Sequence, residues 1–174
     1  MATKFHELIP LLARAHVEFI ILGGVAARVH GSARLTEDLD VAYRRSEENI
    51  ERIVEALAPY SPYLRGAPPG LPFKWDARTI ENGLNFTLTT TLGAIDLLGE
   101  VTGGGKYEDL LPHTVTQEFY GHECRCLDVQ TLIKVKRAAG RPKDFEAIAE
   151  LEAILEEQRQ QQAQNQNLKT QSSQ

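Results

Sequence analysis

Residues 19–41, FIILGGVAARVHGSARLTEDLDV, decide the fold of this 174-residue chain. An apolar run ends at Gly23 and Gly24, a short segment suited to a helix follows, and a second apolar run carries Asp38 and Asp40. Residues two apart on a strand point to the same face, so the two carboxylates converge while the apolar residues between and after them point to the other face. The stretch therefore predicts a strand, a glycine turn, a helix and an acidic strand.

A third carboxylate lies farther along the chain, where Asp96 interrupts the apolar run LGAIDLL at residues 92–98. A lone acid inside such a run needs a partner or a metal ion. Two carboxylates as close as Asp38 and Asp40 repel each other unless a cation lies between them, and hard divalent cations such as Mg²⁺ prefer oxygen ligands. Asp38, Asp40 and Asp96 are therefore the candidate metal ligands.

The residues on either side of the predicted helix are candidates for binding phosphate. Glycine tolerates positive φ and lets the backbone approach a ligand closely, and the start of a helix offers unpaired N–H groups, so Gly23 and Gly24 are a candidate phosphate cradle. Arg34 and Thr36 come just before the acidic pair and are placed to reach the same phosphate. For Arg34, an alternative of equal weight is that it neutralises an adjacent carboxylate.

This order of features resembles the nucleotidyltransferases of the DNA polymerase beta superfamily, whose pattern is a glycine pair, a helix, two alternating acids and a third acid on a later strand. The segments LGGVAARVHG at 22–31 and RLTEDLD at 34–40, with the basic segment at 134–144, look like the small bacterial proteins related to the AbiEii and MenT toxins. The resemblance implies an α/β (α+β) fold with a mixed sheet flanked by helices and a short C-terminal helical segment.

The resemblance also implies an activity: transfer of a nucleoside monophosphate from a nucleoside triphosphate such as ATP to an acceptor hydroxyl or phosphate, with release of pyrophosphate. Asp38 and Asp40 would hold two Mg²⁺ ions, with Mn²⁺ as an alternative, and Asp96 would bind one of them and help to activate the acceptor. Lys134 resembles the family lysine that contacts the triphosphate. A solvated basic helix face is an equally weighted interpretation of Lys134.

The acceptor stays open among three interpretations. A toxin-antitoxin type of enzyme would modify tRNA or protein and pair with a cognate antitoxin protein, and a basic channel would favour it. An antibiotic-type enzyme would modify a small hydroxylated molecule in a closed pocket lined by aromatic residues such as Phe73, Trp75 and Phe86. The third interpretation is a non-catalytic, nucleotide-binding regulatory module that keeps the fold.

Composition and patterning divide the chain into three parts. Residues 1–127 form the expected nucleotidyltransferase core, residues 128–157 the C-terminal helices packed on it, and residues 158–174 a Gln-rich tail expected to be disordered. Asp128 suits a helix start and Gly140 a helix end. Within the core we expect an amphipathic helix at 46–58, a Pro- and Gly-rich loop bordering the cleft at 59–72, and strands at 84–90, 93–98 and 119–127.

The bulk properties restrict the partners. The net charge of −5, from 24 acidic and 19 basic residues, argues against a broad nonspecific nucleic-acid surface but leaves room for a local basic groove. Cys124 and Cys126 are too close in sequence for an ordinary structural disulfide, which fits a reducing compartment. No apolar run approaches the roughly 20 residues of a membrane span. We therefore expect a cytoplasmic protein with no membrane partner.

Overall fold

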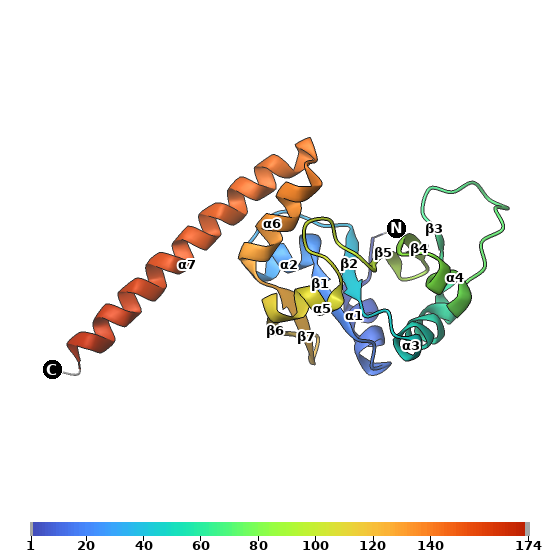
Figure 1. Ribbon diagram of the computed structural model, residues 1–174, viewed down its shortest axis with the longest axis horizontal. Coiled ribbons are helices and arrows are strands. Elements are labelled where there is room, and N and C mark those ends of the chain that lie inside the picture. The colour runs from blue at the N-terminus through green and yellow to red at the C-terminus, as the bar shows by residue number, and fades with distance from the viewer. Residues whose placement is uncertain (1, 173–174) are drawn as a thin grey trace.

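The strands form one mixed sheet in a computed structural model that describes residues 2–172. Within these residues the sheet has seven strands in the order β3-β4-β5-β2-β1-β7-β6. The strands are β1 (Phe19–Leu22), β2 (Asp38–Tyr43), β3 (Tyr63–Leu64), β4 (Asn85–Thr90), β5 (Gly93–Leu98), β6 (Thr114–Phe119) and β7 (His122–Leu127). The predicted α/β fold with a mixed sheet flanked by helices is confirmed (Figure 1).

The helices pack around this sheet and carry the chain between its strands (Figure 1). They are α1 (Phe5–Arg14), α2 (Gly23–Val29), α3 (Glu47–Leu57), α4 (Ala77–Asn82), α5 (Tyr107–Leu110), α6 (Val129–Ala139) and α7 (Phe145–Gln171), with short 3-10 turns at Ala58–Tyr60, Leu111–His113 and Pro142–Asp144. None of the described helices is long and apolar enough to cross a membrane.

Strand β2 lies near the centre of the sheet, antiparallel to β1 and parallel to β5. Its register sets Asp40 directly beside Asp96 on β5. Leu39 and Val41 alternate with the acids and are buried in the hydrophobic core, as the period of two predicts. Core packing on one face of β2 thus fixes the strand that presents the carboxylates on the other face.

Polar side chains fasten the helices to the sheet at their ends. Asn49, on α3, is fully buried, and its amide donates to the carbonyls of Glu18 and Arg44 while its oxygen accepts from the Glu18 N–H. Asp128 accepts from the Thr131 N–H at the start of α6. The predicted limits of α6 are confirmed, because Gly140 takes the left-handed conformation at its end (φ 64°).

The C-terminal segment differs from the predicted disordered tail. Helix α7 continues through the Gln-rich residues to Gln171, and its C-terminal half extends away from the rest of the protein (Figure 1). Gln, Glu, Arg and Ala are good helix formers, so this segment continues a helix whose first turns are anchored by the buried Ile148 and Leu151. Residues 173–174 lie outside the described residues, and the division at 127/128 stays a prediction.

Candidate functional site

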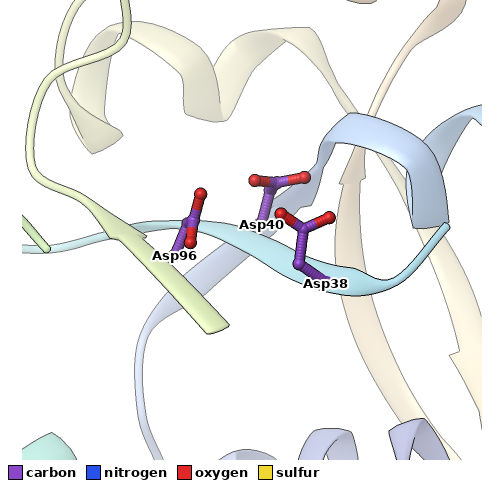
Figure 2. Close-up of side chains that lie close together, drawn as sticks. All are labelled: Asp38, Asp40 and Asp96. Atoms are coloured by element: carbon purple, nitrogen blue, oxygen red, sulfur yellow. The ribbon is translucent and has the colours of Figure 1, made fainter. Parts of the chain in front are cut away.

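The three predicted metal ligands meet on one face of the sheet. Asp38 and Asp40 alternate along β2, and Asp96 extends from the neighbouring strand β5 toward them (Figure 2). One carboxylate oxygen of each residue lies within 4.8 Å of the corresponding oxygen of the other two. All three side chains are half-buried, so they combine access from solvent with a partly desolvated environment.

The environment of the triad disfavours three ionised carboxylates. Burial, followed by the charges of Asp38 and Asp96, raises the pKa of Asp40 to about 7. Burial also raises the pKa of Asp96, against the opposing effect of the Arg65 guanidinium. Oxygen-only ligands that repel one another suit a hard divalent cation, which would remove the repulsion. The chemistry of the donor set therefore fits Mg²⁺ or Mn²⁺.

The triad lies in a cavity of about 770 Å³ between the sheet and the C-terminal helices. This volume is in the range of pockets that hold small molecules and cofactors, about 300–1,000 Å³. Five cations of the rim and wall share the cavity with the acids: Arg34, Arg65, Lys136, Arg141 and Lys143. These five cations, named the basic wall below, share the lining with four carboxylates besides the triad: Glu37, Glu100, Asp144 and Glu150.

The two glycines of the predicted phosphate cradle line this cavity as the first residues of α2. Gly23 has φ 63°, and a Cβ atom added there would lie 2.0 Å from Asp40 Oδ2. A Cβ on Gly24 would lie 2.5 Å from Thr36 Oγ1. Glycine is therefore required at both positions because β2 and the residues before it approach the helix start so closely. A contact with phosphate stays a prediction.

Arg34 and Thr36 both line the cavity, with different partners. The Thr36 hydroxyl donates to the Asp38 carbonyl (3.1 Å), which holds the start of β2. Arg34 does not neutralise an adjacent acid, because its guanidinium pairs with Glu146 of α7 at 3.0 Å. Glu150, one turn farther along α7, accepts from the Ser32 hydroxyl. Helix α7 therefore holds the segment that joins the glycine helix to the acidic strand.

Lys134 does not line the cavity that holds the acids, and its contact with a triphosphate stays a prediction. It lines a separate cavity, together with Arg137 on the same helix. Lys136 is the α6 lysine that lines the acidic cavity, because residues two apart on a helix point in nearly opposite directions. The ammonium of Lys136 lies 3.7 Å from Asp144, whose other carboxylate oxygen accepts from Arg141 Nε at 2.7 Å.

Arg65 is a site residue that the sequence analysis missed. Its guanidinium lies 2.8 Å from Asp96 Oδ1 and 3.6 Å from Asp38 Oδ2, and it donates to the Leu88 carbonyl at 2.7 Å. The available signal was that Arg65 is the one charged residue in the loop at 59–72, which was expected to border the cleft. No local pattern indicates that this side chain crosses β4 to reach β5.

The aromatic residues proposed for a small-molecule pocket are elsewhere. Phe86 is buried in the core, and Trp75 donates its indole N–H to the Val54 carbonyl. Phe73 contacts Tyr63 edge to face. None of the three lines the acidic cavity. Cys124 and Cys126 are buried free thiols, and burial raises their pKa values to about 11 and about 12.

Comparison with known proteins identifies the fold. No protein-family model and no curated protein matches the sequence. Among solved structures, the chain is similar to a protein from Thermotoga maritima described as a "putative nucleotidyltransferase", with a TM-score of 0.50 and 14% identity. The match covers 86% of this chain and 94% of the other. This likeness shows that the chain shares the fold of that protein.

Proposed function

We propose that the protein is a Mg²⁺-dependent nucleotidyltransferase that moves a nucleoside monophosphate from a nucleoside triphosphate to an acceptor hydroxyl. The observation that carries this proposal is the convergence of three carboxylates from β2 and β5 at the floor of a cavity with a basic wall. The acceptor oxygen forms a bond to the α-phosphorus, the bond from that phosphorus to the bridging oxygen breaks, and pyrophosphate leaves. The acceptor proton passes to a carboxylate or to solvent.

In this proposal the residues of the triad have separate roles. Asp38 and Asp40, on one strand, would hold the divalent cations, and Asp96 would complete the site from the neighbouring strand. Bound there, the cations would supply Lewis-acid stabilisation of the charge that develops on the reacting oxygens. Asp96 would also accept the acceptor proton. Positioning and charge compensation by these residues then account for the rate.

The triphosphate is bound by the basic wall. Lys136 takes the role that the resemblance assigned to Lys134, because it lines the cavity and Lys134 does not. Arg141 and Arg34 are the other donors, and guanidinium groups match phosphate oxygens with two parallel hydrogen bonds. Gly23 and Gly24 contribute the backbone N–H groups at the start of α2.

For the acceptor, we propose RNA or protein. The cavity is lined by none of the three aromatic residues that would favour an antibiotic-type substrate. It holds five cations among seven carboxylates, three of which bound metal ions would neutralise. The narrower relation to AbiEii and MenT toxins and a cognate antitoxin are part of the same proposal and rest on the sequence resemblance alone.

The test is incubation of the full chain with each α-labelled nucleoside triphosphate, Mg²⁺ or Mn²⁺, and, in separate reactions, total RNA, protein or small hydroxyl compounds from cells. We expect label to enter the RNA or the protein and pyrophosphate to be released. Asp38→Asn should lower the rate more than about 100-fold, since even outer-shell partners of metal ligands contribute 10–100-fold. Glu51→Gln, on the exposed face of α3, is the matched control and should keep the rate.

Two outcomes would contradict the proposal in different ways. Absence of labelled product with every nucleotide and both metals, while nucleotide still binds, would assign the protein to the regulatory alternative. Labelling that persists in Asp38→Asn would remove the triad from the chemistry. Label confined to small molecules would overturn the choice of acceptor and leave the reaction in place.

A further inference from the structure

The acidic triad already has a cation in contact with it. Among the described residues, Arg65 forms ion pairs with two of the three acids, at 2.8 Å to Asp96 and 3.6 Å to Asp38. Arg65 is the residue that follows β3, at the edge of the sheet, and its side chain reaches its partners across β4. Its side chain is about one third exposed (32%), so the ion pairs are partly buried away from water.

The guanidinium and a divalent ion need the same oxygen lone pairs. An ion held by Asp38 and Asp96 would take the oxygens that the two terminal nitrogens of Arg65 now face. Two positive groups in that space would repel each other in a half-buried site, where charge interactions are stronger than in water. Metal binding at this part of the triad therefore requires the Arg65 side chain to move.

That motion is confined to the side chain. The Arg65 N–H donates to the Thr87 carbonyl at 2.9 Å, which keeps the residue on the edge of the sheet. Nε of Arg65 is buried and has no hydrogen-bond partner, so this group loses nothing when the side chain rotates. The bonds given up are the two ion pairs and the hydrogen bond to the Leu88 carbonyl.

We propose that Arg65 is an internal substitute for the metal ion: it neutralises Asp38 and Asp96 before substrate binds, and it transfers to a phosphate oxygen when the metal–nucleotide complex enters. This inference rests on the proposed function, because it requires the triad to bind metal. A guanidinium fork matches phosphate oxygens with two parallel hydrogen bonds, whereas here its two nitrogens form ion pairs with two different acids and Asp96 Oδ1 has no hydrogen-bond partner. Arg65 thereby couples binding of the metal to binding of the nucleotide.

The first measurement is calorimetric titration of the full chain with Mn²⁺ alone. Removal of the competing cation in Arg65→Gln should tighten Mn²⁺ binding about tenfold, which corresponds to about 1.4 kcal/mol. Arg44→Gln is the matched control, because it removes the same charge outside the cavity. Arg44 also bridges two carboxylates, those of Glu18 and Glu108. It should leave Mn²⁺ affinity unchanged. Unchanged or weaker Mn²⁺ binding in Arg65→Gln would overturn the inference.

The second measurement adds a non-hydrolysable nucleoside triphosphate analogue to the Mn²⁺-saturated protein. Arg65→Gln should bind the analogue several-fold more weakly than the unaltered chain, because the phosphate loses a donor. A residue that only positions Asp96 would give the opposite result for the metal, weaker Mn²⁺ binding, and no direct effect on the analogue. The opposite signs of the two effects therefore identify the transfer of Arg65 from carboxylate to phosphate.

Two further variants keep the inference separate from folding and from the proposed function. Arg65→Lys retains one charge but cannot bridge two carboxylates, so its Mn²⁺ affinity should lie between those of the unaltered chain and Arg65→Gln. It replaces Arg65→Gln in the test if that variant does not fold. Asp38→Asn tests the metal site itself. If Mn²⁺ affinity depends on Asp38 but not on Arg65, only the inference is wrong. If neither the unaltered chain nor any variant binds Mn²⁺, the proposed function is wrong as well.

Discussion

Replacement of Asp40 by Asn should stabilise the protein at high pH while removing a candidate metal ligand. The pKa of Asp40 is about 7 in the fold, against 3.8 for an unperturbed aspartate, because of burial and the charges of Asp38 and Asp96. A difference of about 3 units, at 1.36 kcal/mol each, is roughly 4 kcal/mol of unfavourable ionisation above pH 7. Asparagine has nearly the same shape and no charge, so it avoids this term.

The sign of the pH dependence follows from proton binding. Between about pH 4 and pH 7 the folded protein keeps a proton on Asp40 that the unfolded chain loses, so stability falls as the pH rises through this window. The variant lacks this loss. Its advantage in free energy of unfolding should therefore be about 2–3 kcal/mol larger at about pH 8 than at about pH 5, and constant above pH 8.

Urea unfolding of both proteins at the two pH values, with a chelator present, measures this advantage. Asp76→Asn is the matched control: Asp76 accepts from the Thr79 N–H at the start of α4, which lowers its pKa, so its neutralisation should give no gain at high pH. Mg²⁺ added at about pH 8 should narrow the gap, because the ion stabilises only the protein with the intact site. A gap that does not change with pH would refute the reasoning.

Two other predictions concern the walls of the site. Gly23→Ala should destabilise the protein by about 1–3 kcal/mol in urea unfolding, because the new methyl group would meet Asp40 at 2.0 Å and φ is 63°. Gly121 is the control, since its φ is 84° but the space around it is open. Gly121→Ala should lower the free energy of unfolding by less and leave metal binding intact. Lys136→Gln should weaken binding of a fluorescent triphosphate analogue about tenfold in the presence of Mg²⁺, the loss of one charge-assisted contact. Lys134→Gln should not, and equal effects of the two variants would contradict the assignment.

The acidic part of the site was predictable because it is local. The alternation of acids with Leu39 and Val41 identifies a strand with one buried face, and the apolar run around Asp96 identifies a second strand. Sequence alone does not pair the two strands, and the resemblance to a known family supplied that step. The structure then sets Asp40 beside Asp96, as this step required.

The basic part was not predictable because it depends on tertiary packing. Both Lys134 and Lys136 suit the same helix, and only the face of α6 that packs on α2 and α7 decides which of them meets the acids. The position of the Arg65 side chain depends on the register of β3, an edge strand of two residues. Strand β6 was missed because its residues are mostly exposed, so it lacks the apolar alternation that reveals a strand.

Four of the five cations of the cavity share one property that bears on substrate choice: each is paired with a carboxylate of this chain. Arg34 faces Glu146, Lys136 and Arg141 face Asp144, and Arg65 faces the triad itself. A free triphosphate must compete with these internal carboxylates and also meets the negative charge of the triad. Under the proposed function, a triphosphate that carries divalent cations would neutralise the triad and release Arg65 in the same step. The arrangement of charges thus favours the metal–nucleotide complex over either component alone, which is the selectivity that a metal-dependent transferase requires.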